Sequence, residues 1–203
     1  MKRFVGTAVF AVALPMVSSI PAGAVTSAQL KAKALSLSNF PTGWAIDNRQ
    51  SSSAADKSAC LKNLTVSGKH DAKVTVKFNQ GTVPALKEDL ETGPSAASRY
   101  REATAQLSSC KQISFTSDGQ SASGTVGAMS FPTIGSQSAA YSVSISVQGV
   151  TAGLDIVAFK VGQYIGDVLY EDLGTPDLNQ FKAFVTEAVN KIEGKPTTTP
   201  TTF

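Results

Sequence analysis

The chain is poor in the residues on which most catalytic and metal sites depend. It has one histidine, two cysteines and one tryptophan among 203 residues. His70 lies in a polar segment between Lys69 and Asp71, and no second histidine exists to act with it as a base or a metal ligand. Phosphate-loop, dinucleotide-binding, metalloprotease and serine-hydrolase motifs are also absent. We therefore expect no catalytic residue, no metal site and no cofactor, and a protein that is not an enzyme.

The N-terminus has the pattern of a secretory signal peptide. Two basic residues precede an apolar run at 4–17, and small residues follow at 22–24. The run is too short to cross a membrane, and no cysteine follows it as a lipid acceptor. We expect residues 1–24 to be cleaved near Ala24, so that a secreted, extracellular protein starts near Val25, without stable membrane insertion. An N-terminal anchor helix is the alternative.

Charge is nearly balanced, which argues against nucleic-acid binding. The chain has 18 basic and 15 acidic residues. Removal of the leader takes away Lys2 and Arg3, which leaves 16 against 15, a net charge of +1. No basic stripe with interleaved aromatic residues is present.

The two cysteines of the mature chain, Cys60 and Cys110, predict a disulfide bond. An even number of cysteines in a secreted chain is typical of paired thiols. Two free thiols or a metal pair are the alternatives, although no other ligands cluster nearby. A bridge that closes a loop of about fifty residues contributes on the order of 4 kcal/mol in the chain-entropy model.

Hydrophobic periodicity predicts a single α+β domain over residues 25–194. Alternating apolar residues indicate strands, and apolar residues at helical spacing indicate helices. Because short turns connect the last strands, we expect one antiparallel sheet of about five to seven strands, ending in a meander and covered by helices. The expected strands are 72–78, 85–92, 113–117, 121–131, 138–149, 154–161 and 164–173, with VTAG at 150–153 as a turn, and the expected helices are 27–36 and 95–109.

The longest expected helix lies near the C-terminus. Thr175 is the expected cap, Pro176 the first helical residue and Gly194 the stop signal. Phe181 and Phe184 lie on its apolar side and are expected to pack on the sheet. The Pro/Thr-rich tail at 195–203 is expected to be disordered.

The sequence contains two polar clusters that are explained by their positions in predicted strands, without a functional site. Ser142, Ser144 and Ser146 alternate with apolar residues and indicate the solvated face of a strand. Asp89 and Glu91 would share one face of their strand, and a charged, exposed edge strand explains them more simply than a pair of glycosidase carboxylates.

Three aromatic residues are candidates for a ligand site. Trp44, Tyr100 and Tyr141 can line a cleft, and packing in the hydrophobic core is the alternative for each. The helix that carries Tyr100 has an expected apolar stripe that starts at Ala97.

Several stretches in a fixed order resemble a known family. The segment LSNFPTGWAIDN is followed by CLKNL, a helix that ends in TAQLSSC, the step FPTIGSQSAAY and a closing helix, PDLNQFKAFVTEAVNKI. This order, from Leu35 to Ile192, is similar to PknH-like extracellular sensor domains and to related secreted proteins and lipoproteins of actinobacteria. The kinase sensor domains carry a second disulfide bond that this chain lacks.

The resemblance implies a disulfide-bonded α+β domain with a cleft, which binds or senses a component of the cell envelope. We expect a non-catalytic, monomeric binding module whose partner is an unknown small molecule, a glycolipid or an envelope protein. A protein-interaction module, such as an inhibitor or accessory factor, is the alternative, and a hydrolase is a more remote one.

Overall fold

The computed structural model describes residues 24–49, 72–117, 120–147 and 149–197. The predictions made for the signal peptide, Cys60, His70 and the end of the tail lie outside the described residues. No helix in the described ranges is long and apolar enough to span a membrane.

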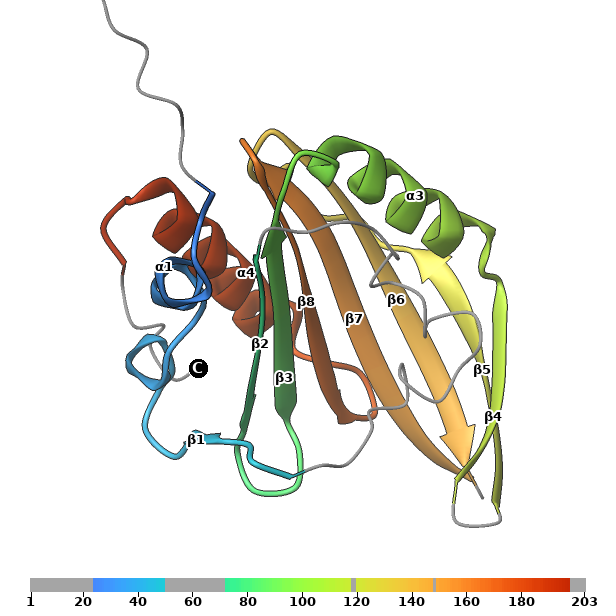
Figure 1. The fold of residues 1–203 in the computed structure, drawn as a ribbon. Coiled ribbons are helices and arrows are strands. Elements are labelled where there is room, and N and C mark those ends of the chain that lie inside the picture. Colours follow the sequence, from blue (N-terminus) through green and yellow to red (C-terminus); the bar gives the residue numbers. More distant parts are fainter. Residues whose placement is uncertain (1–23, 50–71, 118–119, 148, 198–203) are drawn as a thin grey trace, which may run out of the picture.

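Eight antiparallel strands of these described residues form one sheet (Figure 1). The last five strands form a meander, while the hairpin of β2 and β3 joins the sheet beside β8, the final strand of the chain. The sheet order is therefore β1-β2-β3-β8-β7-β6-β5-β4. The strands are β1 (Ala45–Ile46), β2 (Ala72–Asn79), β3 (Ala85–Thr92), β4 (Gln112–Ser117), β5 (Gln120–Ala128), β6 (Gln137–Val147), β7 (Val150–Val161) and β8 (Tyr164–Leu173).

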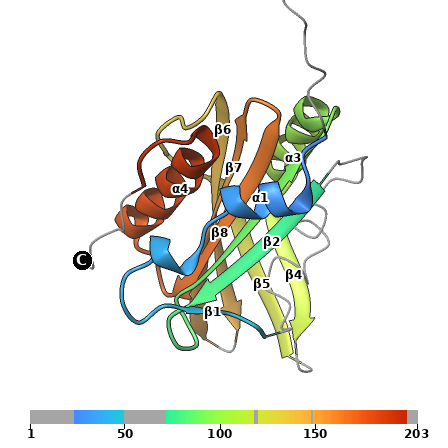
Figure 2. The ribbon, with the colours of Figure 1, turned by 60° about the vertical axis from the view of Figure 1, so that its left-hand side comes forward.

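Helices cover both faces of this sheet. Helix α4 (Leu178–Glu193) and the short helix α1 (Ser27–Lys33) lie on one face, together with the 3-10 turn η1 (Leu37–Asn39). Helix α3 (Ala96–Ser109) lies on the opposite face, as Figure 2 shows. The described residues therefore form two cores, one on each side of the sheet.

Strand β7 shows why both sides are apolar. Leu154, Ile156 and Ala158 belong to the core under α3, and Val157 and Phe159 belong to the core under α4. Successive side chains of a strand point to opposite faces, so a strand covered on both sides reads as a nearly continuous apolar run.

The expected fold class is confirmed, with differences in detail. In the described part of the chain the sheet has eight strands rather than five to seven, and the additional strand is the two-residue β1. The VTAG segment is not a turn, because β7 already begins at Val150 and pairs with β6 from there. The turn lies one step earlier, at Gly149, whose φ of +81° suits glycine.

Both N-terminal ends of the long helices differ from expectation by a few residues. The cap of α4 is Asp177 rather than Thr175, because the Asp177 carboxylate accepts hydrogen bonds from the backbone N–H groups of Asn179 and Gln180. In α3 the buried stripe starts at Ala96, and Ala97 is exposed. Helix α1 ends at Lys33, three residues early.

The core-facing side of α4 confirms its expected role. Phe181 and Phe184 are both fully buried. The ring of Phe181 stacks on Tyr170 of β8 at 5.8 Å between centroids, and Phe184 contacts the ring of Phe40 at 4.7 Å. Gly194 ends the helix in the left-handed conformation, as predicted.

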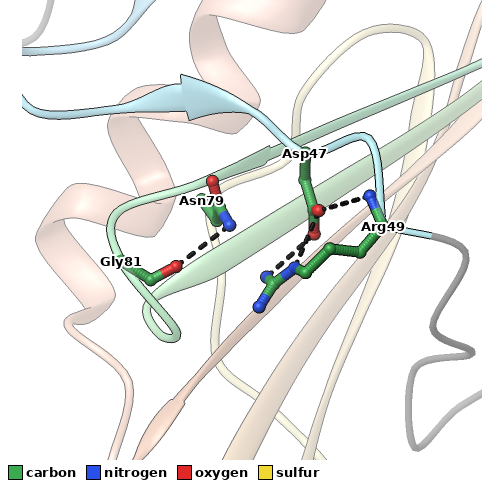
Figure 3. A network of polar contacts seen from close by, with 4 residues as sticks. All are labelled: Asp47, Arg49, Asn79 and Gly81. Carbon is green, nitrogen blue, oxygen red and sulfur yellow. Dashed lines mark hydrogen bonds and ion pairs between the residues drawn. The ribbon is translucent and has the colours of Figure 1, made fainter.

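An ion pair ends the short edge strand β1 (Figure 3). The Asp47 carboxylate accepts three hydrogen bonds from Arg49, two from the guanidinium group and one from the backbone N–H. The Arg49 side chain lowers the pKa of Asp47 by donating to it. The Asp47 backbone N–H donates to the carbonyl of Lys77, so this turn is fastened to β2.

A candidate ligand pocket under helix α3

A pocket lies between α3 and the strands β3, β7 and β8. Its floor comes from the sheet and α3 forms its roof, and both contribute apolar side chains to its wall. Small residues line it from both sides, Ala103 on the helix and Ala158 and Gly166 on the sheet. A larger residue in place of Ala103 on the helix would fill this space. The lining residues are Glu91, Tyr100, Ala103, Leu107, Ala158, Ile165, Gly166 and Asp167.

Two tyrosines and one leucine hold α3 at this height above the sheet. The hydroxyl group of Tyr141, on β6, donates to the backbone carbonyl of Thr104 at 3.3 Å. Tyr100 and Leu107 are buried against the sheet on either side of Ala103. Burial raises the pKa of both tyrosine hydroxyls, so they stay protonated and able to donate hydrogen bonds at neutral pH.

A row of carboxylates on β3 runs toward the pocket, and it is not an exposed edge. Strand β3 lies between β2 and β8, and its Asp89 and Glu91 are only 4% and 8% exposed. The expectation of a charged edge strand is therefore wrong. The prediction that these two residues share a face is confirmed by their alternate positions in the register of β3 with β8.

Both carboxylates of the row have positively charged or hydrogen-bonding neighbours. The ammonium group of Lys87 lies 3.1 Å from Asp89, and the Thr75 hydroxyl donates to the other oxygen of Asp89. The guanidinium group of Arg99, on α3, is almost completely buried and lies 3.6 Å from Glu91. These pairs compensate the cost of burying charge in this part of the sheet.

Asp167 of β8 has a different environment. It lies directly opposite Asp89 in the sheet and lines the pocket. It makes no hydrogen bond or ion pair with the described residues. Burial, followed by the negative charge of Asp89, raises its pKa well above the ordinary value, while Lys87 and Lys73 oppose the change.

The pocket is small. It encloses about 350 Å³ of empty space in all, including solvent at its mouth. Its interior has room for about one water molecule. It therefore suits a small chemical group inserted from the mouth rather than a whole drug-sized molecule.

A second buried carboxyl group lies on the opposite face of β3. Glu88 is fully buried, and its Oε2 accepts a hydrogen bond of 2.6 Å from the backbone N–H of Leu35. Its Oε1 is buried without a hydrogen-bond partner in the described part of the chain. Burial raises the pKa of Glu88 to about 7, the Leu35 N–H and Lys191 lower it, and Asp89 adds a small further increase.

Polar groups from α4 and the N-terminal segment surround this glutamate. Asn39 donates to Glu187 at 2.7 Å and accepts from Lys191 at 3.1 Å. Lys191 also donates to the Ser36 hydroxyl. Because these groups form hydrogen bonds with one another, the cluster fastens the N-terminal segment to α4.

The three predicted ligand residues are not brought together. Tyr100 lines the pocket, and Tyr141 lies beside it under α3. Trp44 lies on the other face, where it is buried against Phe40 and Phe184 with ring centroids at 4.9 and 5.2 Å. A ligand role for these residues stays a prediction.

The remaining sequence predictions have mixed outcomes. The hydroxyl side chains of Ser142, Ser144 and Ser146 are exposed, so the solvated face is confirmed. Cys110 is buried at the end of α3. Its bond to Cys60 stays a prediction, because Cys60 lies outside the described residues.

Sequence reasoning missed Asp167 and Arg99. Asp167 occupies an inward position of its strand, between Ile165 and Leu169, which are both buried. An acidic residue at such a position is a recognisable signal in the alternation of a strand. Its partner Asp89 is far away in sequence, and only the sheet register reveals that the two are opposite each other.

Comparisons with known proteins identify the fold. No family model matches the sequence, and no curated protein matches it. Within the described ranges, no group of three or more histidine, cysteine, aspartate or glutamate residues is arranged to hold a metal ion. The crystal structure of the extracellular domain of PknH from Mycobacterium tuberculosis is similar, with a TM-score of 0.62.

This similarity extends over most of both molecules. It covers 82% of this chain and 97% of that chain, at 11% sequence identity. An identity this low supports a shared fold alone. The resemblance seen in the order of sequence features is thereby confirmed as a structural one: the protein has the fold of the PknH extracellular domain.

Proposed function

We propose that the protein is a secreted, non-catalytic binding module of the cell envelope, which captures a small molecule in the pocket under α3. The observation that carries this proposal is the pocket itself. It combines an apolar wall, Leu107 and Ile165, with two carboxyl groups, Glu91 and Asp167. Ligand sites typically pair an apolar surface with a few fixed polar groups.

The charge pattern favours binding over catalysis. Acid–base chemistry by carboxylates needs two groups that both face the substrate and have different protonation states. Here the Asp89 carboxylate already contacts Lys87 and Thr75, and the Glu91 carboxylate lies beside the guanidinium group of Arg99. Only the Asp167 carboxyl group remains for a ligand, and one such group suffices for binding.

A protein-interaction module is the alternative function. A flat, exposed aromatic patch would favour it. The large apolar side chains exposed in the described part of the chain are aliphatic: Leu37, Ile46, Val150 and Leu173. None of them is aromatic, so the pocket remains the better-supported site. The extracellular location of the similar PknH domain agrees with the secreted placement that we propose.

A fragment titration followed by backbone amide NMR tests this function. Binding should shift the resonances of the residues that line the pocket. Ala103→Leu fills the pocket and should abolish these shifts. Ala105→Leu, on the exposed side of the same helix, is the matched control and should leave them intact. Shifts that survive Ala103→Leu, or that map to the α4 face, would refute the proposed site.

A further inference from the structure

The carboxyl groups beside the pocket indicate the class of its ligand. Three carboxyl groups, those of Asp89, Glu91 and Asp167, face this side of the sheet near the pocket. Cationic partners from the protein lie beside the first two, at 3.1 and 3.6 Å. Asp167 makes no ion pair with the described residues, although Lys87 and Lys73 are near enough to lower its pKa, and it lines the pocket.

We propose that the pocket binds a primary ammonium group carried on a short aliphatic chain, with Asp167 as its counterion. This inference rests on the proposed function and names its ligand class. An ammonium group would replace the missing cation opposite Asp89 and would remove the repulsion between the two aspartates. A carboxylate ligand would add a third negative charge at the same place and would be rejected.

The size and walls of the pocket narrow the class further. The interior accommodates about one water molecule, and a primary ammonium group is of similar size. A quaternary ammonium group carries four carbon substituents and does not fit. The aliphatic chain behind the ammonium group would lie against Leu107, Ile165 and Ala158, which are apolar.

Binding by this arrangement should release a proton. In the empty pocket the pKa of Asp167 is raised, because burial and Asp89 disfavour its charged form. The charged or titratable groups that face it are Lys73 from β2, Lys87, Asp89 and Glu91 from β3, and Tyr100 and Arg99 from α3. A cationic ligand needs Asp167 ionised, so it competes with the proton.

The sign of the pH effect follows. Below the pKa of Asp167, the affinity for an amine should fall about tenfold for each pH unit. Above that pKa the affinity should be constant, until the amine itself loses its proton near pH 10. An uncharged ligand of the same shape should show the opposite trend or no trend.

The experiment is an NMR titration of the purified protein with matched four-carbon probes. These are n-butylamine, butan-1-ol and butyrate, with tetramethylammonium as the bulky cation. Nα-acetyl-lysine methylamide presents the same ammonium group on a peptide, so it distinguishes a protein ligand from a free amine. We expect n-butylamine or the lysine derivative to bind, and the other three probes to bind at least about tenfold more weakly.

Substitutions make the test specific for the carboxyl group. Asp167→Asn should weaken amine binding about tenfold or more and remove its pH dependence. The variant should keep the fold, because it removes a carboxyl group that Asp89 repels. Asp172→Asn is the control on the same strand, since the Asp172 carboxylate accepts from the Leu173 backbone N–H outside the pocket, and it should bind amines normally.

The outcomes separate this inference from the proposed function. If butan-1-ol binds the pocket as well as n-butylamine, or if Asp167→Asn binds amines unchanged, the ammonium inference is wrong while a binding pocket remains. If no probe shifts the pocket residues at millimolar concentrations and no fragment does either, both proposals fail.

Discussion

Replacement of Glu88 by glutamine should change how the stability of the protein depends on pH. Glu88 is fully buried, and its pKa is raised from 4.5 to about 7. In the unfolded chain the same group loses its proton near its ordinary pKa. Between about pH 4.5 and pH 7 the folded protein therefore holds a proton that the unfolded chain does not hold.

The sign and the magnitude follow from this difference in proton binding. Because the folded state binds the additional proton, the free energy of unfolding falls as the pH rises through this window. The difference between 4.5 and about 7, at about 1.36 kcal/mol for each pH unit, amounts to about 3 kcal/mol. Outside the window this group makes the stability neither rise nor fall.

Glu88→Gln removes the titration and keeps the size and an acceptor for the Leu35 N–H group. The free energy of unfolding of the variant minus that of the native protein should therefore rise by about 3 kcal/mol between pH 4 and pH 8. Urea denaturation at a series of pH values measures this difference directly. Glu102→Gln, on the exposed side of α3, is the control for loss of a carboxylate.

Parallel stability curves for the native protein and Glu88→Gln would refute the reasoning. Such a result would mean that Glu88 is as well solvated, or as well compensated, in the folded protein as in the unfolded chain. A curve for Glu102→Gln that changes as much as that of Glu88→Gln would point to net charge rather than burial as the cause.

Three further predictions concern the hydrophobic core, the disulfide bond and the cleavage of the signal peptide. Phe181→Ala should lower the free energy of unfolding by roughly 3–5 kcal/mol, because the ring is fully buried; a nearly unchanged urea midpoint would make α4 peripheral. Cys60 and Cys110 should be bonded, so that reduction adds the mass of two hydrogens to the secreted protein; two free thiols would contradict this. N-terminal sequencing of the secreted protein should start near Val25, and recovery only with membranes and an intact Met1 would exclude the expected cleavage.

Local patterns in the sequence predicted most elements because they depend on near neighbours. The alternation of Val74, Val76 and Phe78 places β2 correctly, and the glycine at 194 marks the end of α4. Threonine and aspartate are both good caps, so the sequence alone does not distinguish Thr175 from Asp177 as the cap of α4. The backbone geometry selects Asp177.

The site was harder to predict because it depends on pairing between distant strands. The sequence around Asp89 is typical of a charged edge strand, because nothing nearby in the sequence indicates that β8 pairs with β3. The pocket under α3 is lined by Ala103 together with Ala158 and Gly166, which both lie far from Ala103 along the chain. Only the register of the sheet brings such residues together.

The pairing of β3 with β8 also has a consequence for the order of folding. The meander from β4 to β8 consists of neighbours in sequence, so each hairpin can close over a short loop. The β2–β3 hairpin gains its second neighbour only from the last strand of the chain. During synthesis the N-terminal strands therefore emerge first and remain without that neighbour until β8 has left the ribosome. Until then, one side of β3 offers unpaired backbone groups to any other extended chain.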